Sequence, residues 1–274
     1  MLNFKNIQSV AIIGASEDTK KIGNILLEKN QYFIGNIYGI NPKWWSVYGK
    51  NFYPNISSLP EVPDIVVFAI PELFIYDALE ETGKFGIKKV IIITAGFKEV
   101  GNIEWEKKLI EIAKKYNIRI LGPNCLGYGD TNIWLNLSFG GKFFDKGNIG
   151  IISQSGAMAV AITDVLASRN LGFSTFFSLG NKADIDESDI LLELSEDPNT
   201  TVIAMYLESI SRGKVFIENL KKLNNKKPII IMIGGVSEKG KIATASHTGS
   251  LSWNKLMYEA AISEGNGIQI GRAR

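Results

Sequence analysis

The sequence predicts an α/β protein with two open parallel sheets, one in each half of the chain. Short, nearly continuous runs of β-branched and apolar residues recur along it, as expected of strands buried on both faces. Amphipathic segments with helical spacing lie between these runs. At 274 residues, 45% of them hydrophobic, the chain is also long enough for two domains.

The first half alternates strand-like runs with helical segments. The runs span residues 9–16, 35–42, 64–71, 88–97 and 118–127. Residues 74–86 and 104–117 have apolar side chains at helical spacing. This alternation predicts a βαβ series around a parallel sheet, and we place the first domain at residues 1–127.

A glycine-rich, aperiodic stretch at residues 128–147 is interpreted as the domain junction. Helical spacing returns at residues 158–170 and 214–224. Strand-like runs follow at 148–153, 172–180, 201–208 and 228–235. We therefore expect a second parallel sheet in a domain of residues 128–274.

Composition excludes several classes of function. The 30 Lys and Arg residues nearly balance 28 Asp and Glu residues, so the formal charge of +2 gives no basic field for nucleic acid or an anionic membrane. The apolar runs are far shorter than the ~20 residues needed to cross a bilayer. The N-terminus has no stretch typical of a signal peptide, and a single cysteine suits a reducing compartment. These features predict a soluble, cytoplasmic protein.

A ligand crevice is expected at the carboxyl ends of the first-half strands, where open α/β sheets bind their ligands. The second strand ends in Lys43 rather than in the acidic residue that holds a dinucleotide ribose, and a GxGxxG fingerprint is absent. A nucleotide that carries an extra phosphate on its ribose therefore fits better than NAD. Cys125 is interpreted as an inert buried thiol rather than a nucleophile. The candidate binding residues at these strand ends are Gly14, Ala15, Ser16, Lys43, Ile70, Pro71, Ala95, Gly96, Asn124 and Cys125.

His247 is the only histidine of the chain and lies among glycine and small hydroxyl residues. Glu208 closes a strand of the same half, and residues 153–157 (SQSGA) turn from a strand into a helix. A carboxylate can fix the tautomer of an imidazole that attacks phosphorus, and the amides of Ser155 and Gly156 can hold the phosphoryl group. From the residues alone, an exposed Glu208 and a surface His247 remain an open alternative.

The acidic stretch DIDESD at residues 184–189 is interpreted as a helix start rather than a metal site, because acidic residues favour helix N-termini. We assign no metal ligands to the chain. Magnesium is expected to arrive with a nucleotide on a partner.

Eight segments, taken together and in order, resemble the NDP-forming acyl-CoA synthetases, in particular the α chain related to the α subunit of succinyl-CoA synthetase. The resemblance extends from about residue 6 to about residue 264. The segments are GAS (14–16), INPK (40–43), AGFKEVG (95–101), LGPNCLG (121–127), GNIGIISQSGA (147–157), SLGNKADIDESDIL (178–191), YLES (206–209) and SHTGSL (246–251).

The resemblance implies an N-terminal Rossmann-like CoA-binding domain followed by a flavodoxin-like ligase domain. It implies that His247 is phosphorylated and that Glu208 orients it. Residues expected to stabilise the phosphate or the phosphohistidine are Ser153, Gln154, Ser155 and Gly156. CoA is the implied substrate together with a small carboxylic acid or its acyl-CoA. ATP or ADP with Mg²⁺ is expected on a separate ATP-grasp β subunit, in an α2β2 or similar assembly. The segments that contact CoA in this family contain Gly14, Ala15, Ser16, Lys43, Pro71, Asn124 and Cys125.

One departure from the family keeps other functions in view. After SHTGSL the family continues with a small residue and glycine, whereas this chain has Ser252 and Trp253. A CoA-binding regulatory module without turnover is therefore the first alternative. An NAD-type oxidoreductase is the second, disfavoured by Lys43 and by the missing glycine fingerprint.

Overall fold

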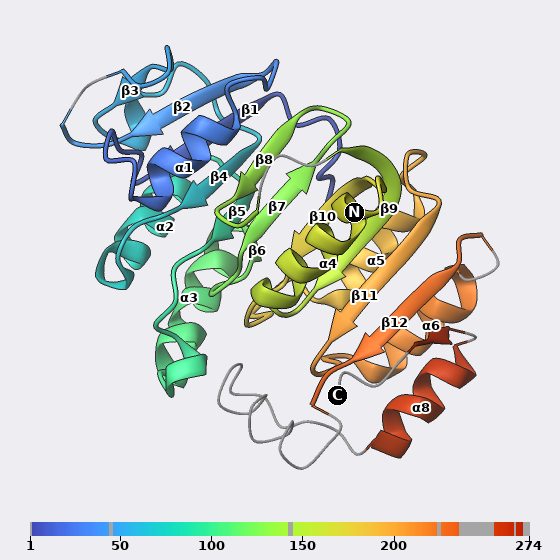
Figure 1. Ribbon diagram of the computed structural model, residues 1–274. Coiled ribbons are helices and arrows are strands. Elements are labelled where there is room, and N and C mark those ends of the chain that lie inside the picture. The colour runs from blue at the N-terminus through green and yellow to red at the C-terminus, as the bar shows by residue number, and fades with distance from the viewer. Residues whose placement is uncertain are drawn as a thin grey trace.

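The protein forms two β-sheets that lie side by side with helices on their faces (Figure 1). The computed structural model describes residues 2–43, 46–141, 145–223, 226–235, 255–265 and 267–270. The predicted α/β class with a parallel sheet in each half is confirmed, with one change in the second sheet described below.

The first sheet has six parallel strands in the order β3-β2-β1-β4-β5-β6. The order reverses at β1, which pairs with β2 on one side and β4 on the other, as in dinucleotide-binding folds. Every predicted strand is present, whereas the two-residue β3 is too short to produce a pattern. The strands are β1 (Ser9–Ile13), β2 (Asn36–Ile40), β3 (Phe52–Tyr53), β4 (Ile65–Phe68), β5 (Lys89–Ile92) and β6 (Arg119–Leu121).

Helices cover both faces of this sheet. The helices α2 (Ile75–Lys84) and α3 (Ile103–Tyr116) pack together on one face and bury Leu79 and Leu109 against the strands. On the other face α1 (Ile22–Lys29) lies between the first sheet and strand β8 of the second. One continuous hydrophobic core therefore joins the two halves.

The second sheet has seven strands in the order β13-β12-β11-β9-β10-β7-β8. Strands β9 to β13 are parallel, and β7 and β8 are antiparallel. The strands are β7 (Gly127–Asp130), β8 (Leu135–Ser138), β9 (Lys146–Ser153), β10 (Phe173–Ser178), β11 (Val202–Leu207), β12 (Ile229–Ile233) and β13 (Ile268–Gln269).

Residues 128–147, interpreted as an aperiodic stretch, contain most of strand β7, all of strand β8 and the start of β9. Strands β7 and β8 form a hairpin at the edge of the second sheet, so this sheet is not purely parallel. All residues of both strands are buried, but β7 reads GYGD and β8 reads LNLS, and glycine, aspartate and asparagine are more typical of turns than of strands. Gly127 at the start of β7 also looks like a loop residue in the sequence. It is glycine because its φ is +120° and because an added Cβ would lie 1.9 Å from the backbone oxygen of Leu137 in the neighbouring strand.

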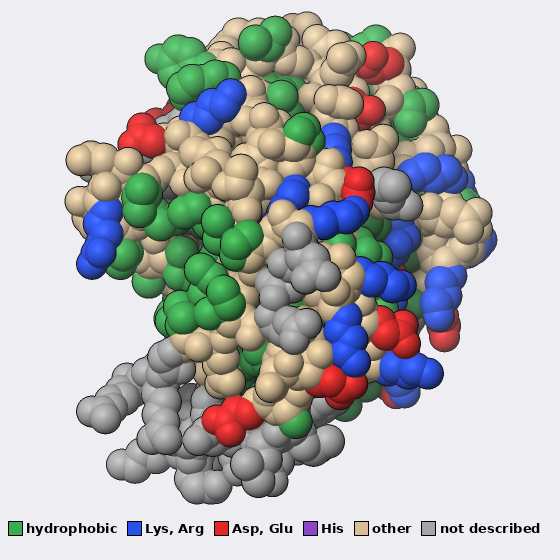
Figure 2. Space-filling view, turned by 90° about the vertical axis from the view of Figure 1, so that its right-hand side faces the viewer, with side chains coloured by type: hydrophobic (Ala, Val, Ile, Leu, Met, Phe, Trp, Pro, Cys, Tyr) green, Lys and Arg blue, Asp and Glu red, His purple; other side chains and the backbone are tan. Residues whose placement is uncertain are grey.

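Helices also cover the second sheet on both faces. One face holds α4 (Gly156–Ser168) over β9 and β10, and the other holds α5 (Glu187–Ser195) and α6 (Gly213–Leu223). The helix α8 (Lys255–Glu264) packs against α6 and β13. On the face shown in Figure 2, basic side chains lie among acidic ones. Exposed ion pairs of the second half include Lys221–Glu264 and Lys226–Glu196.

The acidic stretch at residues 184–189 starts a helix, as the sequence predicts. The Asp186 carboxylate caps α5 and accepts hydrogen bonds from the amides of Ser188 and Asp189. Within the described residues, no group of three or more His, Cys, Asp or Glu side chains has a geometry suited to a metal ion. Nor does any helix in the described ranges combine the length and apolarity needed to cross a membrane.

A hydrogen-bonded seam joins the end of the first sheet to the second. Ile185 N donates to Ile120 O and Ala183 N to Gly122 O, each over 3.1 Å. At Gly180 an added Cβ would lie 2.3 Å from the carbonyl oxygen of Pro123, so the two backbones touch there. These contacts fix the carboxyl end of β6 in the first sheet relative to the segment that follows β10 in the second.

Candidate functional site

The turn after β1 is packed closely against the neighbouring strands. Gly14 N donates to Ile40 O over 3.1 Å, and the Asn41 side chain donates to Ala15 O over 2.7 Å. Gly14 has a φ of +93°, and a Cβ there would lie 2.3 Å from Ala69 O. Only glycine fits this position, which brings the turn to the crevice at the switch point of the sheet.

Lys43 is exposed beside this turn. Its amide donates to the Asn41 side chain over 3.0 Å, and Asn41 in turn holds Ala15. Ser16 is buried and its hydroxyl accepts a hydrogen bond from Asp18 N over 3.1 Å. The backbone of Lys43 is therefore held beside the turn, and its exposed side chain offers a cation to an anion that binds there.

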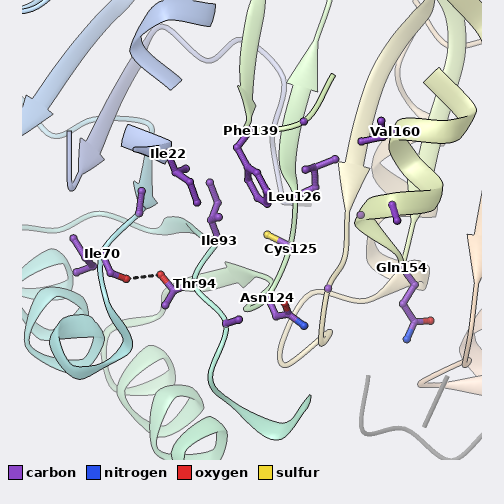
Figure 3. A pocket seen from close by; sticks show the side chains of 16 residues that line it. Ile22, Ile70, Ile93, Thr94, Asn124, Cys125, Leu126, Phe139, Gln154 and Val160 are labelled. Atoms are coloured by element: carbon purple, nitrogen blue, oxygen red, sulfur yellow. Dashed lines mark hydrogen bonds between the residues drawn. The ribbon is translucent and has the colours of Figure 1, made fainter. Parts of the chain in front are cut away.

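A cavity of about 700 Å³ opens between the two sheets (Figure 3). It joins the carboxyl ends of β4 and β5, the turn after β6, and the first turn of α4, so predicted residues from both halves meet in one space. Six predicted residues line it, namely Ile70, Ala95, Asn124, Cys125, Gln154 and Gly156. The remaining described predictions are not among its lining residues: Gly14, Ala15, Ser16, Lys43, Pro71, Gly96, Ser153, Ser155 and Glu208.

The walls of the cavity differ in polarity. Its polar lining residues are Thr94, Asn124 and Gln154. The Thr94 hydroxyl donates to Ile70 O over 2.6 Å, whereas the Gln154 side-chain amide is bonded to residues 208 and 209. The sequence did not predict the apolar side chains of the cavity wall, because apolar residues in strand and helix patterns cannot be told apart from residues of the hydrophobic core. An elongated ligand with both amide and methylene groups fits such walls. The apolar wall is formed by Ile22, Ile93, Leu126, Phe139 and Val160.

Cys125 lines the cavity as a buried thiol. Its side chain is 3% exposed, and the Sγ–H donates to Ile92 O over 3.4 Å. Burial raises the pKa of the thiol to about 12. These properties favour the inert role over the nucleophilic one.

The native Cys125 thiol is accordingly expected to react at least ~100-fold more slowly with an aromatic disulfide reagent at pH 8 than the same thiol in urea. With a pKa of about 12, only ~10⁻⁴ of the thiol is ionised at pH 8. Absorbance of the released thiolate measures both rates. A rapid stoichiometric reaction of the folded protein would show that the thiol is activated.

The first turn of α4 carries the predicted anion site. Ser155 is the N-cap, and its hydroxyl accepts a hydrogen bond from Met158 N over 3.4 Å. The Ser153 hydroxyl donates to Ser155 O over 2.7 Å and stiffens the turn. Because Gly156 opens onto the cavity, the positive end of the helix dipole lies at its edge.

Gln154 connects this turn to the end of β11. Its Oε1 accepts hydrogen bonds from the backbone amides of Glu208 and Ser209, both over 2.9 Å, and its backbone N–H donates to Tyr206 O over 2.9 Å. Gln154, directly before the N-cap of α4, therefore lies next to the backbone of Glu208.

Glu208 is buried rather than exposed. Its exposure is 5%, which excludes a surface carboxylate. Burial, together with a hydrogen bond to Glu208 and its negative charge, raises the pKa of the Tyr206 phenol to about 12. The phenol stays protonated at neutral pH and can hold the carboxylate in place.

His247 lies outside the described residues, within the stretch 236–254. Both flanks of that stretch reach the end of β11. Before it, Gly234 N donates to Leu207 O over 2.8 Å, and after it the Tyr258 hydroxyl donates to Glu208 O over 3.2 Å. Described residues on both sides of the segment that carries His247 therefore contact residues 207 and 208.

Two family profiles match the chain. The profile described as a CoA binding domain matches residues 8–129, and the profile described as a succinyl-CoA ligase-like flavodoxin domain matches residues 146–272.

Curated proteins and solved structures are also similar. The acetate–CoA ligase [ADP-forming] of Methanocaldococcus jannaschii is 47% identical over 94% of this chain and 36% of its own length. The α subunit of acetate–CoA ligase [ADP-forming] II of Pyrococcus furiosus is 41% identical over 95% of this chain and 58% of its own length. The dinucleotide-forming acetyl-coenzyme A synthetase 1 of Ca. Korarchaeum cryptofilum, solved with phosphate and ADP, superposes with a TM-score of 0.93 at 39% identity and covers 97% of this chain and 58% of that one. The chain thus spans between 36% and 58% of these relatives.

Proposed function

This chain belongs to the family of ADP-forming acyl-CoA synthetases as a homologue of their α subunits, and on that premise we propose that it is the α component of an acid–CoA ligase. In the proposed reaction, phosphate attacks the acyl-CoA thioester to give an acyl phosphate and free CoA. The phosphoryl group then moves to His247, which releases the acid, and finally to a nucleoside diphosphate, which becomes the triphosphate.

In this proposal CoA lies along the strand ends of a CoA-binding domain at residues 1–127 and reaches into the cavity. Lys43, exposed beside the Gly14 turn, binds a CoA phosphate. The arm of CoA carries amides and methylenes, which suit the mixed polar and apolar walls. The arm ends near the first turn of α4, where the acyl group meets phosphate. The other proposed CoA contacts are Ala15, Ser16, Ile70, Pro71, Ala95, Gly96, Asn124 and Cys125.

The ligase domain, proposed as residues 128–274, carries the phosphoryl group. His247 is the proposed nucleophile, and Glu208 accepts its second ring N–H and stabilises the charged ring. Residues 153–156 place amides at the positive end of α4 for the phosphoryl oxygens. The observation that carries the proposal is the attachment of both flanks of the His247 segment to residues 207 and 208.

The remaining parts are proposed for a partner. An ATP-grasp β subunit would bind ATP or ADP with Mg²⁺ and complete an α2β2 or similar assembly, and the naming of relatives as α subunits supports such a partner. A small carboxylic acid or its CoA ester is the second substrate, and the cytoplasm is the proposed location. Relatives named as ligases favour this function over a regulatory module or an NAD-type oxidoreductase.

CoA is expected to raise the melting temperature of the isolated chain by about 5 °C or more at ~100 times its Kd, and NAD is expected to leave it unchanged. Calorimetry measures the shift. With an ATP-grasp partner, acyl-CoA, phosphate and ADP should yield ATP. Stabilisation by NAD alone, or a partnered complex that binds CoA and forms no ATP with any acyl-CoA of a broad panel, would contradict the proposal.

A further inference from the structure

A buried ion pair lies outside every site residue assigned above. Lys182 Nζ and Glu187 Oε2 are 2.9 Å apart, and their side chains are 2% and 0% exposed. Burial lowers the pKa of Lys182, although the negative charge of Glu187 acts in the opposite direction and raises it. A buried ion pair of this kind often adds no stability over an apolar pair of similar volume. Its role is therefore better judged from the backbone groups that the two side chains hold in place.

Both members of the pair hold the chain directly after Glu208. The Lys182 ammonium donates to Ser209 O over 2.7 Å, and Glu187 Oε1 accepts a hydrogen bond from Ser211 N over 2.6 Å. From the opposite side, Gln154 accepts hydrogen bonds from the amides of Glu208 and Ser209. The backbone around Glu208 is therefore held by hydrogen bonds from two sides, from the ion pair on one and from Gln154 on the other.

The residue before Lys182 is fixed to the first domain. The Asn181 side chain donates to Glu99 over 2.6 Å and to Glu106 over 2.8 Å, and it accepts a hydrogen bond from the cavity residue Asn124 over 3.2 Å. Lys182 itself has a φ of +56°, which is uncommon for a residue with a side chain. The adjacent side chains of Asn181 and Lys182 thus contact the cavity residue Asn124 and the backbone of Ser209, respectively.

We infer that Lys182 is a positioning residue, which with Glu187 holds the backbone of Ser209 and so fixes the position of Glu208 at the end of β11, next to Gln154. Asn181 anchors this support to the cavity wall formed by the first domain. The use of Glu208 in phosphoryl transfer rests on the proposed function, whereas the support of its backbone does not.

The double variant Lys182→Met/Glu187→Gln tests the inference, because it removes both charges and keeps similar volumes. A single substitution would leave a buried charge without its partner. Backbone amides of residues 206–211 are expected to exchange hydrogen at least tenfold faster in the variant, measured by mass spectrometry on the full chain. If this variant does not fold, Lys182→Gln/Glu187→Gln, whose amides can bond to each other, replaces it.

Leu79→Ala is the matched control for stability. Leu79 is fully buried in the separate core under α2, so this variant loses stability without touching the Glu208 segment. Exchange at residues 206–211 should then rise no more than the global loss of stability requires. Equal exchange in the double variant and in Leu79→Ala would overturn the inference.

Turnover with an ATP-grasp partner gives the second measurement. The double variant should lose about 10- to 100-fold in kcat while its KM for CoA stays within twofold. A kcat within twofold of the unsubstituted protein would also overturn the inference. Failure of the unsubstituted protein to turn over contradicts the proposed function instead, and the exchange experiment then decides the role of Lys182 by itself.

Discussion

Replacing His247 with alanine is expected to lower turnover of the chain with its ATP-grasp partner by at least about 10⁴-fold, because the variant has no nucleophile to receive the phosphoryl group. His247 is the only histidine, so no other imidazole of this chain can substitute. ATP formation from ADP, phosphate and acyl-CoA measures the loss. CoA binding, measured by calorimetry, should be unchanged, since CoA is proposed to bind the first domain.

Glu238→Gln, in the same segment as His247, is the control and should stay within twofold of the unsubstituted chain. Retained turnover in His247→Ala would exclude a phosphohistidine on this chain. A loss that is equal in both variants would point to general disturbance of the segment rather than to the imidazole.

Glu208→Gln has the second largest expected effect, a fall in kcat of about 10²- to 10³-fold with an unchanged KM for CoA. The amide keeps the size of the side chain but cannot accept the imidazole N–H with a full negative charge, so both the tautomer and the charged ring lose their support. The fold should survive, because Gln154 holds the backbone amide of residue 208 and not its side chain. Steady-state kinetics with varied CoA separates kcat from KM.

Glu193→Gln is the matched control for removing a buried carboxylate. Glu193 is 4% exposed and accepts a hydrogen bond from Phe4 N over 2.7 Å, at the N-terminal segment rather than beside α4. Its substitution should cost stability without a specific fall in kcat. If both variants lose the same kcat, or if Glu208→Gln changes only KM, the proposed role of Glu208 fails.

Much of the fold is predictable because its strands are buried on both faces. Runs such as residues 9–16 and 201–208 are almost entirely apolar, and each contains the observed strand, β1 or β11. The hairpin β7–β8 was not predicted. Its glycine and asparagine residues are typical of loops, and only tertiary contacts such as that of Gly127 with Leu137 explain them as strands.

The site was predictable to the extent that strand ends determine it. Ile70, Asn124 and Gln154 share one cavity because the carboxyl ends of parallel strands meet at one edge. Phe139 was missed because it follows an unpredicted strand, and apolar cavity walls have no sequence signal of their own.

The contacts that join separate elements were beyond prediction. Gln154 reaches Glu208 only because β9 and β11 are neighbours, an order that the sequence does not state. Lys182 was missed for a related reason. The acidic residues after it correctly indicated a helix start, but nothing in their pattern shows that one of them is buried with a lysine.

The most direct test of the account is to locate the phosphoryl group. The unsubstituted chain and its partner would be incubated with γ-labelled ATP and Mg²⁺, digested at alkaline pH, and analysed by mass spectrometry. We predict base-stable, acid-labile phosphate on the peptide that contains His247. Acid-stable phosphate on Ser153 or Ser155, base-labile phosphate on Glu208, or label confined to the partner would contradict it.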